Sequence, residues 1–266
     1  MSYHLCRLPM AEHPYYIRSI STSIYSLEEL CYYLHHNVYL IDETLVNEQL
    51  CDWLRDEFGL TRLYRTLYDA LEHRNVADFI LPIFREIGYL RPEEMKSYQD
   101  ELGRIQVKPE DERQKMKADY LVRSGMYDHA IGEYFQILDR QDSGRLSAQF
   151  YAQVWSNAGC AFARLFEFEA AAGCFFRSWK LVRTKEALRK YVSALPMFLS
   201  QEAYEERLKE LGADQQLISR MQEYNVHILQ KAQKESSRIR REQTGDGEAL
   251  EGLKAEYRRS VCSKGA

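Results

Sequence analysis

Apolar side chains recur every three or four residues along most of the chain, and this period predicts α-helices that each bury one face. Turn and capping residues divide the first 107 residues into about five such helices. The predicted ranges are 26–37, 45–59, 61–71, 78–88 and 92–102. The chain is therefore expected to belong to the all-α class, and its N-terminal part to form one helical unit.

Local residues set the limits and the place of these helices. Ser26 begins the first with a capping box, in which Ser26 and Glu29 are expected to satisfy each other's free backbone amides. Residues 78–88 are apolar all round the helix axis, so this helix is predicted to be central, with Pro82 in its first turns or at a kink. Residues 1–25 contain isoleucines among serines and predict an extended segment or a loop against the first helix.

After residue 108 a longer pattern occurs twice, with small residues where two helices cross and large residues between them. The second copy contains Trp155, Ala158, Gly159, Phe162, Phe166, Phe168, Ala171, Phe175 and Ser178. The first copy contains Ala118, Leu121, Gly125, Tyr127, Ala130 and Tyr134. Each copy predicts a hairpin of two helices, and in the first copy a tight turn at Gly125 divides them.

The step between the copies is longer than usual for such a repeat. The matching alanines Ala130 and Ala171 are 41 residues apart, whereas two-helix repeats with this pattern of small residues usually recur about every 34 residues. The excess predicts either a longer loop or two extra helical turns before the second copy, which is expected at about 152–184. Residues 185–211 predict a third, degenerate hairpin that caps the array, with Pro196 in its first helix.

From residue 214 the chain becomes polar. An apolar stripe of Leu217, Ile218, Met221, Val226 and Leu229 is expected to dock on the last hairpin. The rest predicts a solvated helix, broken at Thr244–Gly247, and a short helix containing Leu250, Leu253 and Tyr257. The predicted domains are thus an N-terminal helical unit at 1–107, a repeat array at 108–213 and a C-terminal extension at 214–266.

Composition narrows the class of protein further. The 266 residues carry a net charge of −4, which provides no overall positive field for a nucleic acid backbone. No apolar run approaches the roughly 20 residues that span a bilayer, so a cytoplasmic protein is expected. The six cysteines form no Cys-x-x-Cys pair and are interpreted as reduced thiols.

The sequence contains little that predicts chemistry. Adjacent His35 and His36, with His4, Cys6 and His13, are candidate metal ligands, but neighbouring residues on a helix diverge and histidines at a helix end favour the last carbonyls. The acid pairs Asp42-Glu43 and Asp56-Glu57 are attributed to capping or solvation. No phosphate loop, zinc-protease helix or serine elbow is present, so no enzyme activity, cofactor or metal is predicted.

Two surface features admit a second interpretation. The basic cluster Lys231, Lys234, Arg238, Arg240 and Arg241 favours a solvated helix face over nucleic acid or membrane binding. The N-terminal tyrosines are interpreted as packing residues rather than as a protein interface. They are Tyr15, Tyr16, Tyr25, Tyr32, Tyr33 and Tyr39.

The spacing of the two copies resembles the tetratricopeptide-repeat family over about residues 110–211. The segment IYSLEELCYYLHHNVYLID resembles part of uncharacterised Gram-positive bacterial proteins, which implies no function. In the repeat family the first helices of successive hairpins line a groove that holds a peptide or helix of a partner. The resemblance implies a groove between helices 113–124 and 152–164, with candidate contacts Lys115, Asp119, Tyr120, Asn157, Cys160 and Arg164.

Some members of this family clamp the C-terminal carboxylate of chaperones. Lys115 and Asn157 match that clamp, but Asp119 stands where an asparagine is needed and would repel a carboxylate. The last two clamp positions fall on Ala187 and Tyr191, or on Lys185 and Arg189 after a shift of two residues. A chaperone tail is therefore a weakly supported partner.

The predicted function is a scaffold or adaptor for protein–protein interaction. Three alternatives remain at this point: a regulatory nucleic-acid-binding protein that uses the basic C-terminal helix, an enzyme without a recognisable motif, and self-association into a homo-oligomer. The sequence does not determine the partner, the pathway or the oligomeric state.

Overall fold

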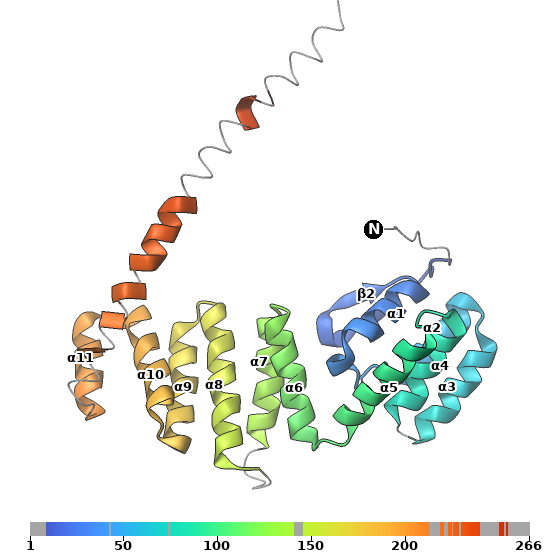
Figure 1. Ribbon diagram of the computed structural model, residues 1–266, viewed down its shortest axis with the longest axis horizontal. Coiled ribbons are helices and arrows are strands. Elements are labelled where there is room, and N and C mark those ends of the chain that lie inside the picture. Colours follow the sequence, from blue (N-terminus) through green and yellow to red (C-terminus); the bar gives the residue numbers. More distant parts are fainter. Residues whose placement is uncertain are drawn as a thin grey trace, which may run out of the picture. The chain divides into compact units, whose positions relative to one another are not determined.

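The computed structural model describes residues 9–42, 44–73, 75–140 and 146–212, and beyond them 219–220, 223–224, 226–228, 230–239, 250–252 and 254. The protein is mostly helical, as predicted (Figure 1). It divides into two compact units, Met1–Ala187 and Leu188–Ala266. The predicted boundary near residue 107 lies within the first unit, in the short link between two helices.

The first unit begins with a β-hairpin, followed by helices that the sequence predicted closely. The elements are β1 (Tyr15–Ile17), η1 (Arg18–Ile20), β2 (Thr22–Ile24), α1 (Leu27–His36), η2 (Val38–Leu40), α2 (Glu48–Phe58), α3 (Thr61–His73), α4 (Val76–Ile87), α5 (Pro92–Gln106), α6 (Glu110–Arg123), α7 (Tyr127–Asp139), α8 (Ala148–Arg164) and α9 (Phe168–Val182). α10 (Lys185–Ala194) crosses from the first unit into the second, which also contains η4 (Leu195–Met197) and α11 (Gln201–Glu210).

The N-terminal residues form an antiparallel hairpin, which is the extended alternative of the sequence prediction. Tyr15 pairs with Ile24, Tyr16 with Ser23 and Ile17 with Thr22. Tyr15, Ile17 and Ile24 are buried, so one face of the hairpin joins the core. The alternation of side chains along a strand explains why Tyr16 between them is exposed.

Helix ends follow the predicted capping residues, with one correction. The Ser26 side chain accepts from the Glu29 amide at 3.2 Å, as expected. The Glu29 carboxylate, however, accepts from the amide of Tyr25 at 2.7 Å and not from that of Ser26. Gly59 and Gly88 end α2 and α4 in the left-handed conformation, with φ of +68° at each.

α4 is the central helix of the N-terminal helices, as its all-round apolar pattern predicted. Phe79, Ile80, Ile83 and Phe84 have no exposed surface, and α4 contacts α1, α3 and α5. Pro82 lies in the second turn of this helix. Across this core the Tyr98 hydroxyl of α5 donates to the Leu34 carbonyl at 2.6 Å.

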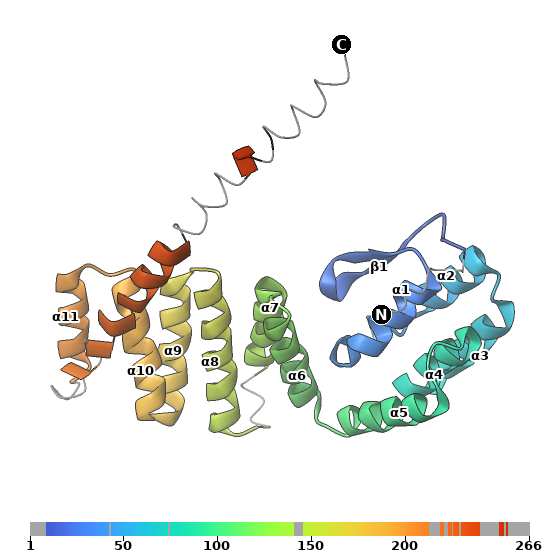
Figure 2. The same ribbon diagram turned by 45° about the horizontal axis from the view of Figure 1, so that its top comes forward.

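Two helical hairpins follow, α6–α7 and α8–α9, and α7 packs against α8 (Figure 2). The small residues that defined the two sequence copies lie at the closest packing. Ala118, Ala130, Ala158 and Ala171 have no exposed surface. The same hydrophobic core runs from the N-terminal helices into both hairpins.

Three predicted details of this region need correction. α8 begins at Ala148, with Ser147 as its N-cap, and not near Ala152, so part of the extra length is additional helix. α6 begins at Glu110, the predicted start of the first repeat, and not at Arg113, where the predicted groove helix began. Pro196 is not inside the first helix of the third hairpin, because α10 ends at Ala194 and Pro196 lies in η4, where its ring does not interrupt α-helical hydrogen bonds.

The residues described beyond 218 are helical in short stretches. Of the stripe predicted to dock, Val226 is 53% exposed, and Leu217, Ile218, Met221 and Leu229 lie outside the described residues. The predicted break at Thr244–Gly247 and the apolar residues Leu253 and Tyr257 also lie outside them, whereas Leu250 is exposed.

Candidate functional site

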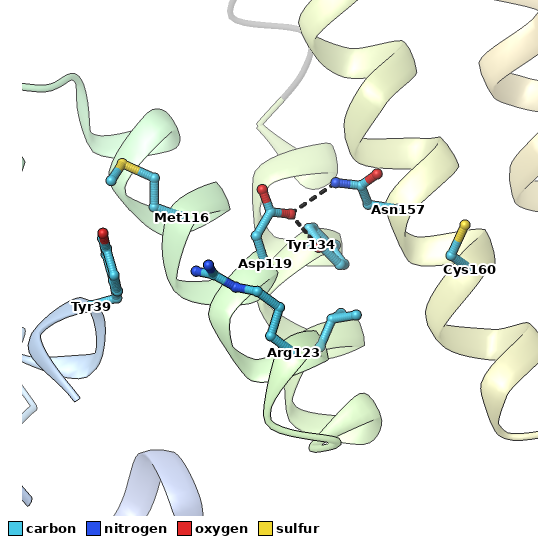
Figure 3. A pocket seen from close by; sticks show the side chains of 8 residues that line it. Tyr39, Met116, Asp119, Arg123, Tyr134, Asn157 and Cys160 are labelled. Carbon is cyan, nitrogen blue, oxygen red and sulfur yellow. Dashed lines mark hydrogen bonds between the residues drawn. The ribbon is translucent and has the colours of Figure 1, made fainter. Parts of the chain in front are cut away.

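A cavity of about 470 Å³ lies in the first unit, beside α6, α7, α8 and η2. Its lining comprises Tyr39, Met116, Asp119, Val122, Arg123, Tyr134, Asn157 and Cys160 (Figure 3). α6 contributes four of these side chains, spaced so that they share one side of the helix. The lining of the cavity thus contains both apolar and polar side chains.

Asp119 is the centre of hydrogen bonding in this cavity (Figure 3). Its Oδ1 accepts from the Tyr134 hydroxyl at 2.5 Å and from Nδ2 of Asn157 at 2.8 Å. Its Oδ2 accepts from Nζ of Lys115 at 2.6 Å. The carboxylate thus accepts hydrogen bonds from groups of α6, α7 and α8, and these contacts tie the three helices together.

The surroundings of Tyr134 keep its hydroxyl protonated, so that it donates to Asp119. Burial raises the pKa of Tyr134, and the hydrogen bond to the Asp119 carboxylate raises it further. The hydroxyl stays protonated near neutral pH and continues to donate.

Arg123 presents a different kind of group to the cavity. Its side chain is exposed, and its guanidinium lies 5.9 Å from the ring centre of Tyr39 and 5.8 Å from that of Tyr120. Among the residues that the structure describes, no carboxylate pairs with it. The N–H groups of Arg123 are consequently available to an acceptor that enters the cavity.

The η2 wall of the cavity is fixed by polar contacts between distant parts of the chain. Nζ of Lys117 lies 2.6 Å from a carboxylate oxygen of Asp42 and 2.6 Å from one of Glu133. The Tyr120 hydroxyl donates to the His36 carbonyl at 3.0 Å and to Asn37 Oδ1 at 2.8 Å. These contacts hold α6 against η2 and so position Tyr39 at the cavity.

The six residues predicted as partner contacts fall into three groups. Asp119, Asn157 and Cys160 line the cavity together. Lys115 is paired with Asp119, and the Tyr120 hydroxyl is bonded to the N-terminal helices. Arg164 is exposed at the end of α8 and is not part of the lining. Their roles in binding remain predictions.

Five of the lining residues are not among the partner contacts predicted from the sequence. Met116, Val122 and Arg123 are within four residues of Asp119 on α6, so helical periodicity could have found them. Tyr134 appeared in the repeat pattern but only as a packing residue. Tyr39 lies 80 residues before Asp119, and no local pattern connects the two.

The positions required for a carboxylate clamp meet its needs only in part. One N–H of the Asn157 amide already donates to Asp119. Ala187 and Tyr191, where strict repeat spacing placed the last two clamp residues, are 8% and 5% exposed. Ala187 and Tyr191 therefore supply no cation at the strict positions, whereas Lys185 and Arg189, the positions after a shift of two residues, are exposed.

The candidate metal ligands are used in packing and hydrogen bonds. Nδ1 of His36 lies 2.9 Å from the Tyr32 carbonyl, the end-of-helix contact that was expected. His35 packs edge-on against Tyr89 and Tyr98. His4 and Cys6 lie outside the described residues, and in the rest no group of three histidine, cysteine or acidic side chains is placed to hold a metal ion.

The acid pairs do more than cap or face solvent. Asp42 joins Lys117, and the Glu57 carboxylate accepts from the Glu12 amide at 2.6 Å and from Nδ1 of His13 at 3.0 Å. The backbone and side-chain hydrogen bonds from His13 lower the pKa of Glu57. Asp56 pairs with Arg55 in solvent, as expected, and Glu43 lies outside the described residues.

The N-terminal tyrosines are divided between packing and surface. Tyr15 and Tyr33 are buried, as the packing interpretation predicted, and Tyr39 is half-buried. Tyr16, Tyr25 and Tyr32 are at least 40% exposed. In the basic C-terminal cluster, Arg238 pairs with Glu235, Lys231 and Lys234 are exposed, and Arg240 and Arg241 lie outside the described residues.

Within the part of the chain that the structure describes, no helix is both long enough and apolar enough to cross a membrane. Comparisons of the chain with protein-family models, with curated proteins and with solved structures found no match.

Proposed function

We propose that this protein is a cytoplasmic scaffold or adaptor, in which two tetratricopeptide-like hairpins bind a peptide or a helix of a partner protein. The observation that carries the proposal is the cavity on α6 and α8, the first helices of the two hairpins. Repeats of this kind commonly use their concave surface for binding. Free thiols at Cys31, Cys51, Cys160 and Cys174 agree with a reducing compartment.

The chemistry of the cavity suits a binding role. Met116, Val122 and the ring of Tyr39 offer apolar area, and Arg123 offers an unpaired donor group. A few directed polar groups in an otherwise apolar depression are typical of ligand sites. Since Asp119 already accepts three hydrogen bonds within the protein, binding is proposed to depend on Arg123, Val122 and Tyr39 and less on the acid itself.

The test is site-specific photo-cross-linking in cells of the source organism. A photoreactive phenylalanine analogue replaces Val122 in the cavity, and the control protein carries it at Glu169, which is exposed on α9. A defined protein cross-linked from Val122 and absent from Glu169 would support the proposal. The cross-link should also weaken in an Arg123→Ala variant that unfolds at the same temperature as the parent.

Arg123→Ala is preferable to a substitution of Asp119 or Asn157. Removal of Asp119 would leave Lys115, Tyr134 and Asn157 without their acceptor, so lost binding could reflect altered folding. Identical cross-linked products from Val122 and Glu169 would count against a binding site in the cavity.

A further inference from the structure

The segment from Arg177 to Lys185, at the C-terminal end of α9, concentrates positive charge in a chain whose net charge is negative. These nine residues, RSWKLVRTK, contain four cations and no acid, whereas the whole chain carries a net charge of −4. Arg177, Lys180 and Arg183 are all exposed. They lie on or directly after α9 (Figure 1), at intervals of three residues.

Each of these three cations lies over an aromatic ring. The guanidinium of Arg177 is 4.5 Å from the ring centre of Trp155, and that of Arg183 is 4.2 Å from the ring centre of Trp179. Nζ of Lys180 is 4.6 Å from the ring centre of Phe176. Such contacts restrict long side chains while leaving their N–H groups free to donate.

None of the three cations is paired with a carboxylate among the residues that the structure describes. By contrast, Lys115, Lys117 and Arg140 of the neighbouring hairpin all form ion pairs. A row of ordered and unpaired cations lowers the entropy lost when an anion binds. We propose that this row, Arg177, Lys180 and Arg183, binds a short acidic segment of a partner protein.

The backbone conformation of Arg183 supports a functional role for its side chain in this row of cations. Arg183 has a φ of +51°, in the left-handed region where glycine is the favoured residue at a helix end. A non-glycine residue in that region is strained, and such strain is often retained where the side chain has a function. At this position the arginine side chain extends over Trp179.

The observations favour a carboxylate-rich segment over a nucleic acid strand. Base stacking needs free aromatic faces, but each ring here already carries a cation over one face, and Trp155 is only 8% exposed. A long polyanion would also extend beyond four cations onto a protein with a net charge of −4. A run of a few carboxylates matches the size of the row.

This surface is separate from the cavity. Trp155, which carries Arg177, and Asn157, which lines the cavity, are two residues apart on α8 and so point in nearly opposite directions. The two sites can therefore be altered independently, and failure of one proposal leaves the other intact.

The test uses the full chain and fluorescence anisotropy at 50 mM and 200 mM salt. The probes are fluorescein-labelled octaglutamate, octaglutamine and the DNA strand dT8. Octaglutamate is expected to bind more tightly than dT8, to weaken with added salt and to bind more tightly than octaglutamine. Tighter or equal binding of dT8, or no octaglutamate binding up to about 1 mM, would overturn the proposal.

Two sets of variants assign the binding to this surface. Changing Arg177, Lys180 and Arg183 to Glu should weaken octaglutamate binding by about tenfold or more. A control with the same change in net charge replaces Arg62, Arg65 and Lys96, exposed cations of α3 and α5, and should retain most of the affinity. Equal loss in both triple variants would contradict a specific site.

Arg183→Gly keeps the test decisive if the triple variant does not fold. Glycine relieves the left-handed strain, so the melting temperature should stay the same or rise, while octaglutamate affinity should fall by about threefold. Unchanged affinity in this variant would remove Arg183 from the proposed row.

Discussion

The hairpins α6–α7 and α8–α9 share one sequence pattern and both bury its alanines, but they differ in the contacts that are added to this packing. In α6–α7, charged and polar side chains provide the specific contacts: Lys117 pairs with Glu133, and Arg140 pairs with Asp111. In α8–α9 the helices pack through small residues, and a Cβ built on Gly159 would lie 2.7 Å from the ring of Phe175. Ion pairs therefore supplement the apolar packing of the first hairpin, whereas a close contact between glycine and an aromatic ring supplements that of the second.

The two turns differ at equivalent positions. Gly125 joins α6 to α7 with a φ of +77°, which glycine adopts without strain. At the matching place between α8 and α9, Phe166 has a φ of +64° and is 80% exposed. The tightly packed second hairpin therefore has a strained turn at Phe166. The first hairpin avoids this strain because it has glycine at the equivalent position, Gly125.

The largest effect is expected where the second hairpin is most closely packed. Gly159→Val should lower the free energy of unfolding by about 3 kcal/mol, because even a Cβ would be 2.7 Å from Phe175 and 3.1 Å from the Ala171 carbonyl oxygen. Urea denaturation measures the change. Gly173→Val on α9, where nothing lies within 4 Å of the added Cβ, should change stability by less than about 0.5 kcal/mol.

A smaller loss is expected when the ionic hairpin loses its central cation. Lys117→Met should lower stability by about 2 kcal/mol, because the partly buried carboxylates of Asp42 and Glu133 would lose their cation and keep hydrogen bonds from neutral groups alone. The matched variant Lys108→Met removes a more exposed pair with Glu112 and should cost no more than about 0.5 kcal/mol. Equal effects in the two variants would show that burial of the Lys117 cluster adds nothing.

The pH dependence of the same variant sharpens this prediction. Burial alone would lower the pKa of Lys117, but Asp42 and Glu133 outweigh it and raise the pKa above its ordinary value of 10.5. The contribution of the charged lysine is therefore complete below pH 10.5 and is lost as pH rises through the raised pKa. The stability difference between wild type and Lys117→Met should therefore narrow as pH rises through that alkaline range.

An exchange of the turn residues should give a still smaller effect, with opposite signs in the two hairpins. Phe166→Gly should raise the free energy of unfolding by about 0.5–1 kcal/mol, because it relieves the left-handed strain of an exposed residue. Gly125→Phe should lower it by about 1 kcal/mol for the converse reason. Thermal melts of the two single variants and the double variant measure both changes. A destabilised Phe166→Gly protein would mean that the exposed ring makes a stabilising contact.

Two cysteines of the second hairpin, Cys160 and Cys174, are expected to differ in how fast their thiols react. Cys160 is exposed at the cavity, whereas Cys174 is buried and its pKa is raised by burial to about 11. In native protein at pH 8, iodoacetamide should modify Cys160 at least about 100-fold faster than Cys174. Peptide mass mapping over time measures both rates, and in denaturant the difference should disappear.

Three of the eight residues that line the cavity are among the contacts predicted from the sequence, and there is a physical cause for the absence of the others. Asp119, Asn157 and Cys160 were placed together because equivalent positions in successive hairpins face the same side. Arg177, Lys180 and Arg183 were not singled out from the sequence, since their rings and their lack of carboxylate partners become visible only after folding. The same holds for Tyr39, which reaches the cavity through η2.

The sequence by itself determined the helical class and most helix limits. Ser26, Gly59, Gly88 and Gly125 act on backbone groups within a few residues, so their effects can be predicted without knowledge of distant parts of the chain. The small residues at Ala118 and Ala158 likewise marked the hairpins through local spacing.

Only the tertiary structure decided which distant groups meet. Lys117 and Asp42 are 75 residues apart, and Tyr120 and Asn37 are 83 apart, yet these pairs fix α6 against the N-terminal helices. Such contacts leave no periodic pattern, because a charge or hydroxyl finds its partner only after the intervening helices have packed. The cavity wall at Tyr39 exists because those contacts form.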